Sequence, residues 1–414
     1  MVDPEEIARR ARQIGDAAGR ARSEPLYGAG APVPGGEPRG LRDPREVVAE
    51  SGLVDPRRVP VGLALAGGGA KGAYQAGVVR FLAEQGVQVV AVAGASIGAL
   101  NGAVLAAARD LAAAAVALRE VWWQAARDTG PPKAGVGVVW DEGIGDQVRN
   151  LPGRMSGPML QPGYLDALLT KYVDPEALRR GLPLFVTTFR AVDPVVGSRR
   201  PLDYFRNQPW DGPVRGAGFR LGAMIDVLRS KAGRSSDWVY VNDMPPVRMH
   251  NVILGSAGIP FLMAPRNVNG VPVRDGDVLG RGNMPVGALA GRIPCERVVA
   301  VHLQDQPLFH GGAFPGSDVV QIHPSRSLRP SGPLGTASGS LDLSPARVEA
   351  LYELGYDDAK DQLGRVWTED AARQLAEAVA GFRHDAVAEL DEPLRNPGPG
   401  SGSGPEGITD DPEI

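Results

Sequence analysis

The stretch VGLALAGGGAKGAYQAGVVRFL, residues Val61–Leu82, decides the fold of this sequence. An apolar run leads into a cluster of glycines, and a pattern with helical spacing follows it. A strand, a glycine-rich turn and a helix in this order present backbone N–H groups to an anion. The sequence therefore raises two alternatives: a bound phosphate, or an oxyanion that forms only during a reaction.

A phosphate site is the weaker of these alternatives. Gly67, Gly69 and Gly72 satisfy the G-x-G-x-x-G pattern of dinucleotide sites. Such a site also needs an acidic residue at the end of the next strand, and the expected strand VQVVAVAGAS, residues 87–96, contains none. A P-loop needs Ser or Thr after its Gly-Lys pair, whereas Lys71 precedes Gly72. Both phosphate interpretations lack their second requirement.

The turn after that second strand favours the oxyanion. GASIG, residues 94–98, has the pattern G-x-S-x-G, which places a serine on a sharp strand-to-helix bend. Gly94 and Gly98 would let neighbouring backbone approach, and the following helix would favour negative charge at Ser96. A simple turn of small residues is the alternative. The position between a strand and a helix favours a nucleophilic serine.

The glycine loop one strand earlier can supply the N–H donors that a serine nucleophile needs. Two neighbouring parallel strands would bring Gly67–Gly69 and Ser96 to the same carboxyl edge of a sheet. A general base must also be present. Asp275-Gly276 follows an apolar, strand-like piece and offers a carboxylate, although an ordinary Asp-Gly turn is equally consistent with the pattern. His302, at the end of the expected strand RVVAVHL, is a weaker candidate for a triad.

Together these segments resemble the patatin-like phospholipases. The matching pieces are GGGAKGAYQAGV at residues 67–78, GASIGALNG at residues 94–102 and DGD…NMPV at residues 275–286. The strand LPLFVTTFRAV and the segment GSAGIPFLMAPRNVNGVPVRDG support the resemblance. The resemblance extends over residues 60–303, and the first two motifs at this spacing are specific.

The resemblance implies a three-layer α/β/α sandwich with a mainly parallel sheet, followed by a helical C-terminal extension. It also implies a Ser-Asp dyad that hydrolyses acyl esters of lipids without histidine, metal or organic cofactor. Ser96 becomes the nucleophile, and Gly67, Gly68 and Gly69 form the oxyanion loop, with the N–H groups of Gly68 and Gly69 lining the hole. The remaining motif residues are Lys71, Gly72, Gly94, Gly98 and Gly276. Lys71 is expected either to be a solvated loop residue or to contact an anionic head group.

The aspartate motif departs from the family pattern. Asp277 stands where the family has Gly or Ala, and the Asn-x-Pro at residues 283–285 lies two positions too far from Asp275. Either the loop carries two extra residues and Asp275 is the base, or Asp277 is the base in a shifted register. We favour Asp275 because Gly276 follows it and the upstream segment aligns without a gap.

The amino-acid composition limits the classes of function that this chain is expected to have. The net charge is −4 with no basic domain, so nucleic acid is not an expected partner. Cys295 is the only cysteine, which excludes an intrachain disulfide and a cysteine-based zinc site. The charged N-terminus lacks the apolar core of a secretory signal. We expect a cytoplasmic enzyme that acts on phospholipid or lysophospholipid, peripherally at a membrane surface.

The alternatives are a soluble esterase or thioesterase for small acyl compounds, and a lipid-binding protein with a degenerate site. A regulatory ligand or partner is conceivable, but no residue set specifies one. The chain is expected to divide into an N-terminal helix and Pro/Gly linker at 1–58, a catalytic domain at 59–325 with an insertion or cap at 195–250, a helical extension at 326–392 and a disordered acidic tail at 393–414.

Overall fold

The structure is a computed structural model of the chain, and it separates into two compact units. One unit contains Asp55–Trp367, and the described part of the other is residues 368–395. The expected N-terminal helix and linker and the acidic tail lie outside the described residues. The residues described are 55–128, 163–192, 213–232, 235–258, 265–276, 282–304, 308–309, 313–328 and 342–395.

The larger unit is built on one sheet with the strand order β5-β6-β3-β2-β1-β7-β8, in which β4 also pairs with β3. The pairs β1–β2, β1–β7, β2–β3 and β7–β8 are parallel, whereas β4 and β6 run antiparallel to β3, and β5 runs antiparallel to β6. The predicted α/β class with a mainly parallel sheet is therefore confirmed. The strands are β1 (Val61–Leu65), β2 (Val89–Ala95), β3 (Leu184–Arg190), β4 (Asp237–Tyr240), β5 (Arg266–Val268), β6 (Val271–Asp275), β7 (Arg297–Val301) and β8 (Asp318–Ile322).

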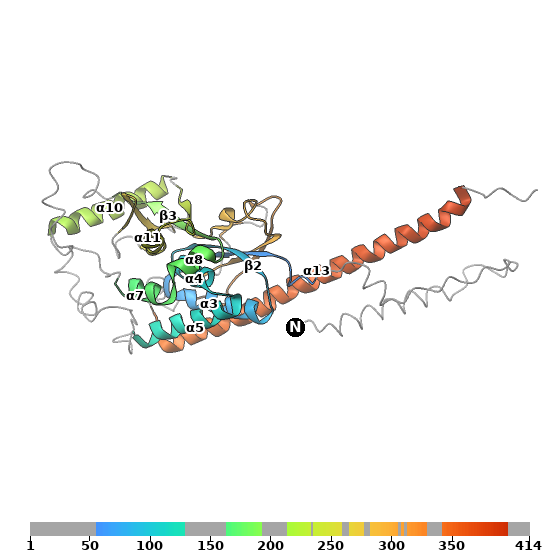
Figure 1. Cartoon of the computed structure of the whole chain (residues 1–414), viewed down its shortest axis with the longest axis horizontal. Helices are drawn as coiled ribbons and strands as arrows, with labels where there is room; N and C mark the ends of the chain where they lie inside the picture. The colour runs from blue at the N-terminus through green and yellow to red at the C-terminus, as the bar shows by residue number, and fades with distance from the viewer. Residues whose placement is uncertain are drawn as a thin grey trace, which may run out of the picture. The chain divides into compact units, whose positions relative to one another are not determined.

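The helices follow the pattern that the apolar periodicity predicts, with a helix after each of the first two strands. Figure 1 shows α3, α4 and α5 gathered on one side of β2, with α10 beyond β3 on the other side. The helices are α3 (Ala73–Glu84), α4 (Ile97–Ala107), α5 (Leu111–Asp128), α7 (Gly163–Tyr172), α8 (Pro175–Arg180), α10 (Pro213–Lys231), α11 (Pro246–Ser256) and α13 (Pro345–Arg395), with 3-10 turns η1 (Gly69–Gly72) and η4 (Val286–Ala288).

The two faces of the sheet differ in side-chain size. Leu63, Leu65 and Val92 face the helix layer and belong to the main core with α3, α4, α5 and α11. The alternate positions Ala64 and Ala93 are small and pack against η4 in a second, smaller core. Because successive residues of a strand point to opposite faces, this alternation fixes which face carries the thick helix layer.

The α10 helix lies over the second face near the end of β3. Asp226 on α10 is buried and forms an ion pair of 2.9 Å with the buried guanidinium of Arg274 on β6. The Arg229 guanidinium sits 5.8 Å from the centre of the Phe189 ring on β3. A buried charge is tolerated when it is paired, so the ion pair anchors α10 to β6, the strand that ends in Asp275, and the Phe189 contact joins α10 to β3.

The region 195–250 contributes directly to the layers. Its residues 237–240 form β4 within the sheet, and α11 starts at Pro246 and packs against β3, β5 and β6. Residues 193–212 lie outside the described residues. The proposed role of the region as an insertion or cap stays a prediction.

The C-terminal extension is helical, as predicted. The first part of α13 packs against α3, where the Tyr74 hydroxyl donates to Asp358 Oδ2 at 3.0 Å. The Phe81 ring lies between Tyr356 and Trp367, with ring centres 5.6 and 5.7 Å away. Among the described residues, no helix combines the length and the apolar character needed to cross a membrane.

Candidate active site

Ser96 occupies the bend between β2, which ends at Ala95, and α4, which begins at Ile97. Its backbone has φ 52° and ψ −121°, a left-handed conformation that is uncommon for a residue with a side chain. Such a conformation costs about 1–3 kcal/mol and persists only where the surroundings impose it. Here the Ser96 N–H donates to Ser256 Oγ at 2.9 Å, and Ser256 Oγ donates to the Thr187 carbonyl at 2.7 Å.

The two glycines that flank Ser96 allow this bend. A Cβ at Gly94 would lie 2.3 Å from the Gly98 carbonyl oxygen, and a Cβ at Gly98 would lie 2.3 Å from the Leu65 carbonyl oxygen. Both separations are shorter than a carbon–oxygen contact permits. Gly94 is therefore required by the close approach of β2 to the start of α4, and Gly98 by the close approach of α4 to β1.

Asp275 is the partner of the Ser96 side chain. The Ser96 hydroxyl donates to Asp275 Oδ2 at 2.7 Å, and the two residues are only 5% and 6% exposed. Asp275 ends β6 opposite Thr188 of β3, and its N–H donates to the Gly258 carbonyl at 3.1 Å. The sheet thus brings together two residues that are 179 positions apart.

Gly276, the residue after Asp275, packs closely against β3. A Cβ at Gly276 would lie 2.5 Å from the Thr187 carbonyl oxygen, and the Gly276 carbonyl accepts a 2.7 Å hydrogen bond from Ser236 Oγ. The residue after Gly276, Asp277, lies outside the described residues. A hydroxyl bonded to a carboxylate at a helix N-terminus is an arrangement suited to nucleophilic attack.

The glycine loop of β1 lies beside Ser96. A Cβ at Gly67 would lie 3.0 Å from Ser96 Cβ, so the loop and the serine are in direct contact. The N–H of Gly67 is engaged by Asn283, through both the side-chain Oδ1 and the backbone carbonyl. The Gly67 N–H therefore already has a partner, in keeping with Gly68 and Gly69 as the expected donors, and the place of Gly67 in the oxyanion loop stays a prediction. The N–H groups of Gly68 and Gly69 have no acceptor among the described residues.

These motifs fall within a segment that matches a known family. The patatin-like phospholipase family matches residues 63–290, more than half of the chain. The chain belongs to the patatin-like phospholipase family. Ser96, Asp275 and the glycine loop all lie within the patatin-like segment.

The chain is also similar to individual proteins. A segment of 51 residues is 49% identical to lysophospholipase nte1 of Aspergillus terreus, and it covers 12% of this chain but only 3% of that protein. VipD from Legionella pneumophila has 12% identity and a TM-score of 0.34, with 82% of this chain and 79% of that chain covered. Human GIVD cytosolic phospholipase A2 has 12% identity and a TM-score of 0.35, with 80% and 66% covered. These TM-scores are low, so the assignment rests on the family match.

Lys71 is buried in the patatin-like domain, with 8% of its surface exposed. Its ammonium donates to the Leu303 carbonyl at 3.1 Å, which links the glycine loop to the end of β7. Of the two alternatives for Lys71, the solvated loop residue is therefore wrong, whereas contact with an anionic head group stays a prediction; the side chain supports the loop from inside the protein.

His302 does not share the Ser96 site as the triad alternative requires. Its Nε2 lies 3.1 Å from Gln321 Oε1, and its ring stacks on His323 with centres 4.1 Å apart. Burial, together with the neighbouring His323, lowers the pKa of His302 to about 3. Both contacts belong to the β7–β8 edge, and the Ser96 hydroxyl is bonded to Asp275.

Sequence reasoning assigned no role to Ser256, Gln75 or Asn101. Ser256 supports the Ser96 N–H from α11, 160 positions away, and nothing local in its sequence marks that contact. Gln75 and Asn101 lie within the quoted family motifs as polar residues among apolar neighbours, which was the available signal, and the structure buries both. Among the described residues, no group of three or more His, Cys, Asp or Glu side chains gathers as a metal site. Metal-independent chemistry stays a prediction.

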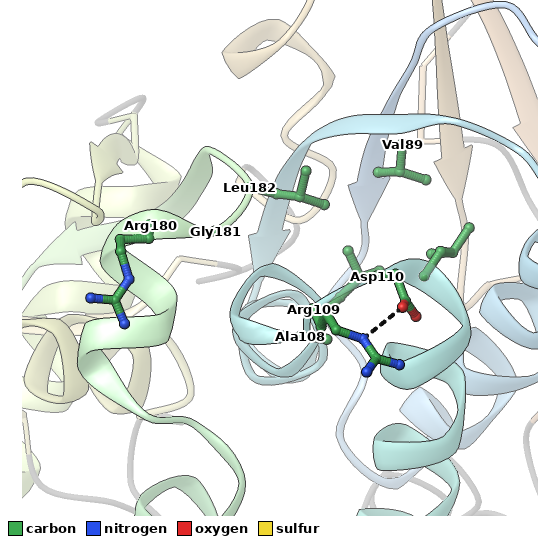
Figure 2. A pocket seen from close by; sticks show the side chains of 9 residues that line it. Val89, Ala108, Arg109, Asp110, Arg180, Gly181 and Leu182 are labelled. Carbon is green, nitrogen blue, oxygen red and sulfur yellow. Dashed lines mark hydrogen bonds and ion pairs between the residues drawn. The ribbon is translucent and has the colours of Figure 1, made fainter.

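A separate hollow of about 360 Å³ opens at the other end of β2, and Figure 2 shows its lining. Arg109 and Asp110 form an ion pair of 2.9 Å at its rim. Because β2 runs from Val89 in this hollow to the bend at Ser96, the hollow is not part of the candidate active site. Its lining residues are Val89, Leu105, Ala108, Arg109, Asp110, Leu111, Arg180, Gly181 and Leu182.

Proposed function

We propose that this chain is a lipid acyl hydrolase of the phospholipase A or lysophospholipase type, with Ser96 as the nucleophile and Asp275 as the general base. The observation that carries the proposal is the 2.7 Å hydrogen bond from the Ser96 hydroxyl to Asp275 Oδ2, at a strained bend beside a glycine loop. Family membership supports lipid esters as the substrate class.

The first half-reaction transfers the acyl group to the enzyme. Asp275 takes the hydroxyl proton while Ser96 Oγ attacks the ester carbonyl carbon, and the carbonyl oxygen becomes an oxyanion. The N–H groups of Gly68 and Gly69 donate to that oxyanion, and the N-terminus of α4 adds a favourable dipole. When the intermediate collapses, the protonated Asp275 gives its proton to the departing lipid alcohol. The fatty acyl group remains as an ester of Ser96.

The second half-reaction uses the same groups in reverse. Asp275 takes a proton from a water molecule, and the resulting hydroxide attacks the acyl-serine carbonyl. The same glycine loop stabilises the second oxyanion. Collapse returns the proton to Ser96 Oγ and releases the fatty acid. The ester substrate and one water molecule, together with Ser96 and Asp275, balance both steps.

We further propose that the enzyme is cytoplasmic and works peripherally at a membrane. Met224 and Leu228 on α10 are 49% and 57% exposed, and Trp238 on β4 is 41% exposed. Trp238 shares the sheet face of Phe189, over which α10 packs, because strand residues in register share a face. The Arg292 guanidinium lies 5.1 Å from the Trp238 ring centre. Exposed apolar and aromatic side chains with a basic neighbour suit the interface of an anionic bilayer.

The test is fatty-acid release from phospholipid vesicles and from lysophospholipid by the wild-type chain and three variants. Ser96→Ala and Asp275→Asn should each lower kcat by roughly 10³-fold or more, since each removes a group acting on the reacting atoms. Asp277→Asn is the matched control and should retain activity within about threefold.

The result that contradicts the proposal is full activity in Ser96→Ala. Loss of activity in Asp277→Asn with retention in Asp275→Asn would instead move the base to Asp277. If the chain hydrolyses a short soluble ester and is no faster on phospholipid vesicles or micelles, the esterase for small acyl compounds is indicated instead. No Ser96-dependent turnover on any ester would indicate a lipid-binding protein.

A further inference from the structure

Both ends of the glycine loop are held by buried side-chain amides. Gln75 Nε2 on α3 donates to the Ala66 carbonyl at 2.8 Å, just before the loop. Asn101 Nδ2 on α4 donates to the Gly72 carbonyl at 3.0 Å, just after it. We propose that Gln75, Asn101 and Trp122 form a hydrogen-bonded relay that positions the oxyanion donors, an inference that rests on the proposed function.

Trp122 fixes the orientation of the two side-chain amides in the relay. The indole Nε1–H of Trp122 on α5 can only donate, and it points to Asn101 Oδ1 at 3.1 Å. The Asn101 amide must therefore turn its Nδ2 toward the Gly72 carbonyl and toward Gln75 Oε1, which is 2.9 Å away. Gln75 then has only its Nε2 left for the Ala66 carbonyl. A single donor-only group thus fixes both amide orientations.

The relay is enclosed by the protein. Gln75, Asn101 and Trp122 are 0%, 2% and 3% exposed, and they come from three different helices. A buried polar group needs a partner, and a fully satisfied network specifies one arrangement of its members. The indole also fills the space beside the loop, since a Cβ at Gly72 would lie 2.7 Å from Trp122. The loop end is therefore held by a hydrogen bond and by contact.

The relay touches neither Ser96 Oγ nor Asp275, so its effect on catalysis must pass through the loop. The donors at Gly68 and Gly69 lie between its two anchors, Ala66 and Gly72. Oxyanion donors act only when they lie about 2.7–3.1 Å from the position of the oxygen in the transition state. Loosening an anchor should therefore lower kcat and leave KM nearly unchanged, because the ground-state substrate does not use these donors fully.

The closing experiment compares Trp122→Phe with Trp123→Phe. The first removes the donor that orients the relay and keeps most of the ring. The second makes the same chemical change one residue along α5, where the ring packs edge-on against Tyr352 with centres 5.1 Å apart. Trp122→Phe should lower kcat on phospholipid vesicles by roughly 10-fold with KM within about twofold. Trp123→Phe should leave kcat within about twofold of the wild type.

Two further variants keep the inference falsifiable if Trp122→Phe folds poorly. Asn101→Asp and Gln75→Glu keep the shape of each side chain but remove the donor to the loop carbonyl. Each should lower kcat more than KM, and each is checked by thermal unfolding. The relay would be overturned if folded Trp122→Phe kept the kcat of the wild type. It would also be overturned if Trp123→Phe lost as much kcat as Trp122→Phe, or if the variants changed KM alone. Equal rates in the wild type and Ser96→Ala would instead indicate failure of the proposed function.

Discussion

Ser96 shows how one residue carries both strain and chemistry. Its φ of 52° is imposed by the junction of β2 and α4 and is held by the bond to Ser256 Oγ. Of the described residues, only Ser96 and Asn269 combine a side chain with a positive φ. At this bend the hydroxyl donates to Asp275 Oδ2, so the strain has a function in the proposed mechanism.

The glycines around Ser96 give a prediction at this scale. Gly98→Ala would place a methyl group 2.3 Å from the Leu65 carbonyl oxygen, in contact with rigid backbone. We expect a loss of about 1–3 kcal/mol in the free energy of unfolding and a large loss of ester hydrolysis. Urea denaturation measures the free energy of unfolding, and turnover on phospholipid vesicles measures ester hydrolysis.

Gly364→Ala is the matched control, since nothing lies within 4 Å of a Cβ at this position of α13. It should stabilise the chain by roughly 0.5–1 kcal/mol, because alanine favours a helix over glycine. Equal stability of Gly98→Ala and the wild type would show that the bend relaxes easily.

At the residue scale the sequence named Ser96 and Asp275, which the structure joins by a hydrogen bond, and it missed the residues that support them. Ser96 and Asp275 each follow a recognisable strand, and their motifs place both at the sheet edge. The engagement of the Gly67 N–H could not be predicted, because Asn283 is 216 positions away. The burial of Lys71 was missed for the same reason, since its acceptor, the Leu303 carbonyl just after β7, is 232 positions away. Long-range contacts of this kind leave no local pattern.

At the scale of elements, the β7–β8 pair carries a pH-sensitive contact. His302 is fully buried and stacks on His323, and burial lowers the pKa of both rings. The folded protein keeps His302 neutral down to about pH 3, whereas the unfolded chain takes up a proton near its ordinary pKa of 6.5. Between these values the unfolded state binds more protons, so the free energy of unfolding decreases as the pH falls.

The decrease in the free energy of unfolding with falling pH can be measured as a slope. Each group contributes up to about 1.4 kcal/mol per pH unit within its window. We expect the urea midpoint to fall from pH 6.5 toward pH 4, and His302→Gln to have a shallower fall. The comparison is between slopes, because the substitution also changes the absolute stability. Parallel pH profiles in the wild type and His302→Gln would contradict the assignment.

The elements that the sequence predicted best are those with local periodicity. The strand–turn–helix units around β1 and β2 were predicted because an apolar run, a glycine cluster and helical spacing follow each other directly. Residues 237–240 were not predicted as a strand. β4 has only four residues, DWVY, and three of them are exposed, so its short apolar run did not stand out in a region interpreted as an insertion or cap. The Asp226–Arg274 ion pair that anchors α10 joins residues with no common motif.

For the molecule as a whole, the alternation of strands and helices predicted the parallel core and the carboxyl edge that carries the site. It did not predict the antiparallel edge formed by β4, β5 and β6, because pairing direction depends on contacts across the sheet. That edge carries Asp275. The patatin-like resemblance supplied the aspartate where local pattern alone left it open.

The exposed apolar side chains give a prediction at the scale of the molecule. Trp238→Ala and Leu228→Ser should each weaken binding to anionic phospholipid vesicles by roughly 10-fold, since inserting such a side chain contributes about 1.5 kcal/mol or more. Sedimentation with vesicles measures the binding. Hydrolysis of a short soluble ester should be unchanged.

Val116→Ser is the matched control, since Val116 is 62% exposed on α5 in the helix layer of the other face. It should bind vesicles as the wild type does. A loss as large as that of Leu228→Ser, or unchanged binding in Trp238→Ala, would contradict membrane contact through this face.

The most direct test of the Ser96–Asp275 dyad is covalent labelling by a fluorophosphonate, followed by mass mapping of the modified residue. We predict an adduct on Ser96, with the labelling rate lowered by roughly 10²-fold or more in Asp275→Asn and unchanged in Asp277→Asn. An adduct on another residue, or a labelling rate at Ser96 that does not depend on Asp275, would contradict the dyad.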